Sequence, residues 1–274
     1  MNTKGGVGKS TLVLAVAETL SAKFAKNVLV IDSDAQASVS LMLVSQGNLH
    51  RLQMEGATVV DMLVAGVLKN LTVDWHRFVI AGVSDVQESR TVFLIPSDMQ
   101  LTLFEREVSK EQALVQLRTT VGALLKAVRE IFDIILVDCP PGLSVLTESW
   151  LREVDFHIAP VVPDHISVYA LEVFGHFKGR NPELGFAENL GIVINMKEME
   201  SASDAGYERR LTENIANRCF PAAVPRTHAL QHAIQLSATE RPYDAKYPAE
   251  AGTALQAVCQ ELLNRLAAAN AAAP

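Results

Sequence analysis

Near its start the chain reads Thr3-Lys4-Gly5-Gly6-Val7-Gly8-Lys9-Ser10-Thr11, and the apolar helical pattern 12–20 follows at once. The glycines let the backbone approach phosphate oxygens and aim N–H groups at them. Lys9 can reach the β- and γ-phosphates of a nucleotide, and the Ser10 hydroxyl can ligate Mg²⁺. The alternative is a glycine-rich turn before a helix, and the Gly-Lys-Ser triplet argues against it. The stretch therefore predicts a phosphate-binding loop.

Outside this loop, short β-branched runs alternate with longer periodic segments. The runs expected to be strands buried on both faces are 27–32, 92–96, 133–138, 156–162 and 190–195. The segments expected to be helices include 9–23, 101–108, 110–131, 168–177, 204–218 and 249–266. This alternation predicts an α/β fold with a doubly wound, mostly parallel sheet. We expect a single domain over residues 1–274.

Two regions carry weaker patterns. Residues 47–90 predict one helix around Thr58–Leu68 and otherwise loop. The Ala-rich tail 267–274 ends in proline, and we expect it to be frayed.

Composition limits the possible partners. Of the 274 residues 49% are hydrophobic, and 24 Lys and Arg against 31 Asp and Glu give a net charge of −7, so no field of the whole molecule attracts nucleic acid or anionic lipid. Three scattered cysteines fit neither a disulfide framework nor a metal site, which favours the cytoplasm. No apolar run is long enough to span a membrane, and we expect no metal other than Mg²⁺.

The loop departs from the common G-x-x-x-x-G-K-[ST] pattern, because Thr3 stands where a glycine is expected and Lys4 follows it. In this it resembles the deviant Walker A ATPases, which include ParA, Soj and MinD, and it is most similar to the ParA type. The resemblance continues at 28–36 (VLVIDSDAQ), 94–97 with Glu105, 132–141 (FDIILVDCPP) and 224–226.

This resemblance implies that the chain binds ATP and Mg²⁺ and hydrolyses ATP. Asp138 ends an apolar strand, where a carboxylate can hold the Mg²⁺ shell opposite Ser10; a strand-end cap is the alternative reading. In the family, Asp34 positions the attacking water, Asp32 belongs to the outer shell of the metal, and Lys4 is supplied across a homodimer to the partner's phosphates. Each of these three could instead be a solvated surface charge.

Further residues are assigned by the same resemblance. Asn195, Pro225 and Arg226 would border the adenine, although a strand-end asparagine is often only a turn former. Cys139 is expected to be a small buried residue, because the other two cysteines lack the contexts of an iron–sulfur ligand set. The implied nucleotide-binding set is Lys4, Gly5, Gly6, Val7, Gly8, Lys9, Ser10, Thr11, Asn195, Pro225 and Arg226.

ParA-type members bind DNA non-specifically and respond to a stimulating partner such as a ParB-like protein. The candidate DNA contacts here are Arg209, Arg210 and Arg218, since 210, 214 and 218 would stack along a helix. However, Ala229 replaces an arginine of the family pattern. No basic tail follows the last helix, so we expect no membrane targeting.

Several possibilities stay open at this point. Ala35, Ala37 and Ser38 replace Pro, Gly and Asn of the family's switch, which leaves the hydrolysis rate open. The leading function is a slow ATPase that partitions plasmid or chromosomal DNA. Alternatives are an ATPase that positions a protein complex, such as cellulose-synthesis or conjugation machinery, and a nucleotide-dependent scaffold that does not hydrolyse.

The start of the chain also differs from expectation. A P-loop follows the carboxyl end of a central strand, but Met1 stands only three residues before Lys4, so no strand fits. We therefore expect two unpaired strand edges inside the sheet, and an amino-terminally truncated reading of a longer product.

Overall fold

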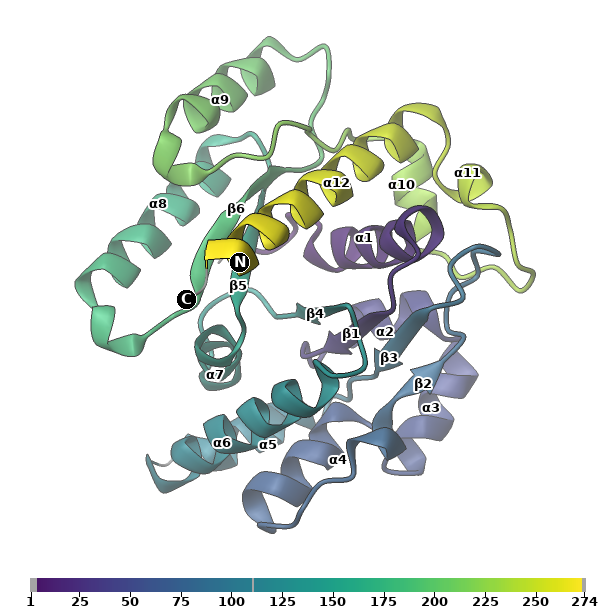
Figure 1. The fold of residues 1–274 in the computed structure, drawn as a ribbon, viewed down its shortest axis with the longest axis vertical. Coiled ribbons are helices and arrows are strands. Elements are labelled where there is room, and N and C mark those ends of the chain that lie inside the picture. Colours follow the sequence, from purple (N-terminus) through teal and green to yellow (C-terminus); the bar gives the residue numbers. More distant parts are fainter. Residues whose placement is uncertain (1–3, 110, 273–274) are drawn as a thin grey trace.

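The computed structural model describes residues 4–109 and 111–272. Its strands form two sheets (Figure 1). The first sheet has the order β2-β3-β1-β4, with bounds Ile80–Ala81, Val92–Ile95, Val28–Asp32 and Ile134–Asp138. The second pairs β5 (Phe156–Val161) with β6 (Glu188–Ile194). Every pairing is parallel except β2 with β3. The predicted α/β fold with a mostly parallel sheet is confirmed.

Helices connect the strands. The first half of the chain has α1 (Lys9–Phe24), α2 (Ser38–Leu43), α3 (Gln46–Met54), α4 (Val59–Leu63), a π-helical turn (Val64–Leu68), a 3₁₀ turn (Trp75–Phe78), α5 (Leu101–Val108) and α6 (Glu111–Val128). The second half has α7 (Val145–Glu153), α8 (His165–Arg180), α9 (Ala202–Glu213), α10 (His228–Ala233), α11 (Tyr243–Lys246) and α12 (Ala249–Ala272), with 3₁₀ turns at Pro182–Leu184 and Ile215–Asn217.

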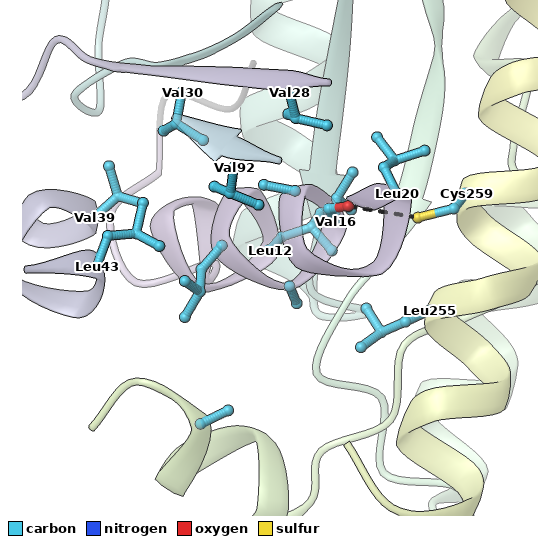
Figure 2. Close-up of a cluster of buried hydrophobic side chains, with 14 of the residues drawn as sticks. Leu12, Val16, Leu20, Val28, Val30, Val39, Leu43, Val92, Leu255 and Cys259 are labelled. Carbon is cyan, nitrogen blue, oxygen red and sulfur yellow. Dashed lines mark hydrogen bonds between the residues drawn. The ribbon is translucent and has the colours of Figure 1, made fainter. Parts of the chain in front are cut away.

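Both faces of the first sheet are covered, because β1 alternates between two cores. Val28 and Val30 pack with α1 and α12, while Leu29 and Ile31 pack with α4 to α7. Figure 1 shows α1 and α12 on one side of the strands and α4, α5 and α6 on the other. Figure 2 shows the first of these cores, where α1 lies between the strands and α12.

No strand pairing joins the two sheets within the described residues. All five residues of β1 are buried, because β1 has a neighbour on each side. Four of the five residues of β4 are only half-buried, since one edge of β4 has no paired strand in this part of the chain. The expectation of unpaired edges inside the fold therefore matches the described structure, while the expectation that β4 is buried on both faces is wrong.

Other differences have local causes. The segment 47–90 is not mainly loop, because α3, a 3₁₀ turn and β2 lie in it besides the predicted helix. Ser45 caps α3 by accepting the Asn48 N–H at 3.3 Å. The tail is not frayed over 267–272, where α12 continues, since alanine is the best helix former. Lys110, where one helix was expected to begin, and residues 273–274 lie outside the described residues.

A buried ion network attaches α1 to the C-terminal part of the chain. The Lys246 Nζ lies 2.9 Å from Glu18 Oε1 and 2.6 Å from Asp85 Oδ1, with all three side chains at most 2% exposed. The Tyr247 hydroxyl donates to Glu18 Oε2 at 2.6 Å, and Arg241 lies 3.0 Å from Asp85. Each buried charge is thus compensated by an opposite charge or a hydrogen bond.

Removing Lys246 should therefore destabilise the fold strongly. Lys246→Ala leaves Glu18 and Asp85 without their shared cation, and we expect the free energy of unfolding to fall by about 3–5 kcal/mol. Arg51→Ala is the control, because the Arg51–Glu55 pair is 63% and 54% exposed and should contribute less than about 0.5 kcal/mol. Urea unfolding measures both values, and equal losses would contradict the assignment.

Candidate functional site

The phosphate-binding loop is built around two glycines in the left-handed region. Gly6 and Gly8 have φ of 76° and 75°, which side chains with a Cβ adopt only with strain. Gly8 is followed directly by α1, whose first turn has neither a side-chain cap nor an acidic residue. The first N–H groups of α1 thus lack a side-chain partner at the positive end of the helix dipole, which suits an anion.

Lys9 begins α1 and lies over this loop. Its Nζ donates to the carbonyl oxygen of Lys4 at 3.4 Å. Burial lowers the pKa of the Lys9 ammonium below its usual value, while the nearby carboxylates of Asp138 and Asp34 act in the opposite direction. The structure therefore brings the loop lysine and the predicted acidic residues into one electrostatic unit.

Asp138 and Asp32 end neighbouring strands in register with each other. Asp138 is 2% exposed, and burial, followed by the charge of Asp32, raises its pKa to about 7 against a hydrogen bond from Ser10. Its Oδ2 is buried without a hydrogen-bond partner in the structure. A buried carboxylate oxygen without a partner, next to the Ser10 hydroxyl, fits a cation held between the two groups.

In the described residues no group of three or more His, Cys, Asp or Glu side chains could hold a metal ion by itself. Proteins commonly bind Mg²⁺ through one or two carboxylates, while nucleotide phosphates and waters complete the shell. Ser10 and Asp138 are the residues that would hold it. An outer-shell role of Asp32 stays a prediction.

Asp32 is fully engaged within the protein. Its Oδ2 accepts the N–H of Ser40 at 2.9 Å and the Ser40 hydroxyl at 2.6 Å, while its Oδ1 accepts the Asp34 N–H at 3.1 Å. Burial raises its pKa to about 6, although these hydrogen bonds act to lower it. Asp32 thus fixes the start of the segment that carries Asp34. Nothing in the sequence pattern identified Ser40, because the contact spans a turn and a helix.

Asp34 lies half-exposed beyond this anchor. Its Oδ1 accepts the Gln36 N–H at 2.9 Å, which closes a short turn. Ala37 then adopts φ 51° and precedes α2 without a side-chain cap. The residue that replaces the family's glycine therefore sits in a conformation that glycine adopts without strain.

Lys4 is held by its own chain. Its Nζ donates to Asp164 Oδ2 at 2.7 Å and to the Ser167 hydroxyl at 3.1 Å. Asp164 is the N-cap of α8, and hydrogen bonds from Lys4 and Ser167 outweigh partial burial and hold its pKa below the usual value. Sequence reasoning missed Asp164, although an Asp directly before a helical segment is a capping signal.

A cavity of about 190 Å³ opens beside the loop. Its lining includes Gly8, Thr11, Leu12, Ala15, Asn195, Met196, Pro225, Arg226, Leu230 and Leu255. The sequence-predicted base residues thus come together next to the loop, among mainly apolar side chains that suit a flat heterocycle. Asn195 is already engaged, because its Nδ2 donates to the carbonyl oxygen of Val7 at 2.8 Å.

The three candidate DNA arginines do not share a helix face. Arg209 and Arg210 lie on α9, which ends at Glu213. Arg218 follows the 3₁₀ turn Ile215–Asn217 and itself has a φ of 49°. The expected stacking of 218 with 210 is therefore wrong. Arg210 pairs with Glu172 at 2.7 Å, and Arg218 pairs with Glu188. No described helix is long and apolar enough to cross a membrane.

Comparisons with known proteins show the family of the chain. A family model described as an AAA domain matches residues 1–179. The sporulation initiation inhibitor protein Soj of Bacillus subtilis is 30% identical over 85% of this chain and 85% of its own. The chromosome partitioning protein ParA of Caulobacter vibrioides is 26% identical, over 89% and 86% respectively. The chain belongs to the ParA/Soj family of P-loop ATPases.

Solved structures share the fold. A putative plasmid partition protein of Borrelia burgdorferi bound to AMPPNP superposes with a TM-score of 0.74 at 19% identity, over 97% of both chains. The cobyrinic acid a,c-diamide synthase of Mycobacterium smegmatis, with a bound ATP analogue and magnesium, gives 0.71 at 17% identity, over 98% of this chain and 94% of its own. At these identities the likeness concerns the fold alone.

The buried Asp138 makes the stability of the metal-free protein depend on pH. Its pKa is about 7 in the fold against 3.8 ordinarily, so ionising it opposes folding, and stability is lost as the pH rises from about 4 to about 7. Asp138→Asn, which carries no charge, should exceed the wild type by about 1–4 kcal/mol at pH 8 and match it near pH 4. Chemical unfolding in EDTA measures this difference, and a wild type more stable than the variant at pH 8 would contradict it.

Proposed function

We propose that the protein binds ATP with Mg²⁺, forms a face-to-face homodimer on it, hydrolyses it slowly, and uses this cycle to partition DNA. The observation that carries the proposal is the meeting of the uncapped first turn of α1 with Lys9, Ser10 and the partnerless Asp138 oxygen. The name of the relative ParA, a chromosome partitioning protein, supports the partition role. The chain would act in the cytoplasm.

Each loop residue has a distinct task in this proposal. The backbone from Gly5 to Thr11 cradles the phosphates, and Lys9 neutralises charge on the β- and γ-phosphates. Mg²⁺ held by Ser10 and Asp138 would supply further positive charge to the phosphates. Asp34 orients the attacking water. For the isolated protein we expect an ATP turnover far below about 10 s⁻¹.

The base would occupy the cavity lined by Asn195, Pro225 and Arg226. The Asn195 amide donates one N–H to the loop, and its carbonyl oxygen can accept a hydrogen bond from an amino group. Adenine carries such an exocyclic amino group at the position where guanine has an acceptor. This favours ATP over GTP.

Lys4 would complete the site of a second copy. Charge delivered across a dimer stabilises the transferring phosphoryl group as an arginine finger does. In this structure Lys4 contacts Asp164 and Ser167 of its own chain, so the proposed dimer requires those contacts to be exchanged for the partner's phosphates. A ParB-like protein is the expected stimulator.

The first test concerns nucleotide binding. Lys9→Ala should lower the affinity for a fluorescent ATP analogue by at least about 100-fold, because it removes the cation at the phosphates. Arg51→Ala, on the exposed face of α3, is the control and should bind like the wild type. An unchanged affinity of Lys9→Ala would overturn the proposal.

The second test concerns the dimer. Asp34→Ala should block hydrolysis but not binding, and therefore trap a dimer of the 29.8 kDa chain with ATP and Mg²⁺. Adding Lys4→Ala to that variant should return it to a monomer. Light scattering distinguishes the two masses, and a monomeric Asp34→Ala protein at saturating ATP would refute the dimer.

A second candidate function is the positioning of a protein complex. It is favoured by the ion pairs of Arg210 and Arg218, which reduce the positive charge available to DNA phosphates. Retardation of plasmid DNA with and without ATP separates the two functions. Release of phosphate from ATP would exclude a scaffold that does not hydrolyse, and its absence would support one.

A further inference from the structure

Ser33 lies between Asp32 and Asp34 in the sequence, and hydrogen bonds hold both its backbone and its side chain. Its N–H donates to the carbonyl oxygen of Asp138 at 2.8 Å, which ties it to the end of β4. Its hydroxyl accepts a hydrogen bond of 2.7 Å from the indole Nε1 of Trp150 on α7. Both Ser33 and Trp150 are 1% exposed, so water does not compete for this bond.

The Trp150 ring is itself held rigidly. It packs in the core that contains Leu29 and Ile31 of β1 and Leu146 of α7. A large ring in a closely packed core has little freedom to shift. The indole N–H is therefore a fixed donor, and it sets where the Ser33 hydroxyl can lie.

Helix α7 is also tied to the other side of the site. The loop 139–143 joins Asp138 to Ser144, which caps α7 by accepting the Thr147 N–H at 3.2 Å. The Ser144 hydroxyl donates to Glu105 of α5, and the same carboxylate oxygen accepts the Leu146 N–H at 3.4 Å. One anchored helix thus contacts the segment after β4 and the segment after β1.

From this geometry we infer that Trp150 is a positioning residue for hydrolysis, which acts through Ser33 on Asp34. Asp34 follows Ser33 directly in the chain, so the backbone position of Ser33 determines where the Asp34 carboxylate can reach. The inference rests on the proposed role of Asp34 in orienting water. Misplacing such a group by a fraction of an ångström lowers the rate without changing how the phosphates are bound.

The test removes the hydrogen bond from each end. Trp150→Phe keeps an aromatic ring but lacks the N–H, and Ser33→Ala lacks the acceptor and leaves Trp150 in the core. Each should lower the maximal rate of phosphate release about five- to tenfold and leave the affinity for an ATP analogue within about twofold. The double variant should be no slower than the slower single one, because both changes break the same bond.

The protein contains two tryptophans, which provides a control and a probe. Trp75→Phe, on the 3₁₀ turn Trp75–Phe78, should hydrolyse ATP like the wild type. Trp150 is then the remaining tryptophan, and its emission should shift when ATP and Mg²⁺ are added. The shift should be lost when Ser33→Ala is combined with Trp75→Phe, whereas a purely structural role of Trp150 would leave it in place.

The outcomes separate this inference from the proposed function. If Asp34→Ala abolishes turnover while Trp150→Phe and Ser33→Ala match the wild type, the positioning role is overturned and the proposed function stands. Losses that multiply in the double variant, or a parallel loss of nucleotide affinity, would also overturn it. A wild type without turnover, or an Asp34→Ala variant at full rate, would overturn the proposed function and this inference with it.

Discussion

The parallel register of β1 and β4 places Asp32 beside Asp138, and the site is organised around these two buried carboxylates. Burial is the main reason why the pKa of each carboxyl lies above its usual range; the charge of Asp32 raises the pKa of Asp138 further, and the charge of Asp34 raises that of Asp32. The fold treats them differently. Asp32 is saturated by hydrogen bonds from Ser40 and Asp34, whereas one oxygen of Asp138 has none. One carboxylate serves the backbone of the switch, and the other is available to a cation.

The network around Asp32 extends beyond the site. The hydroxyl of Ser40, which donates to Asp32, also accepts the N–H of Ser97 after β3 at 3.0 Å. The chain after β1 is therefore bound to the ends of both its neighbouring strands, since Ser33 bonds to the end of β4. Such anchoring holds the start of the switch rigid, while Asp34 and the exposed Gln36 beyond it are less constrained. A segment that is rigid at Asp32 and Ser33 and less constrained at Asp34 and Gln36 can change conformation near a nucleotide while its start stays in place.

Sequence alone predicted those parts of the site that depend on local pattern. Glycines before a helix defined the loop, and apolar runs that end in aspartate located Asp32 and Asp138. It did not predict Asp164, Ser40 or Trp150, because their partners lie across tertiary contacts rather than along one element. The helix over 204–218 was extended too far for the same reason: α9 ends at Glu213, and Asn217 caps the turn by donating to the Leu211 carbonyl oxygen. The short α2 and α3 depend on packing that periodicity does not reveal.

The phosphate-binding loop lies where the two sheets approach each other, and each sheet supplies a different part of the site. Ser10 bonds to Asp138 at the end of β4, in the four-stranded sheet that also carries Asp32. Lys4 bonds to Asp164 after β5, and Val7 accepts a hydrogen bond from Asn195 after β6, in the two-stranded sheet. No strand pairing joins these sheets in the described residues, so their relative position depends on the core that α1 and α12 form with both. A nucleotide that contacts the carboxylates and the cavity beside Asn195 would span this junction. Its binding would then stabilise the relation between the two sheets as well as the loop itself, since a ligand favours the arrangement in which all its contacts are made at once.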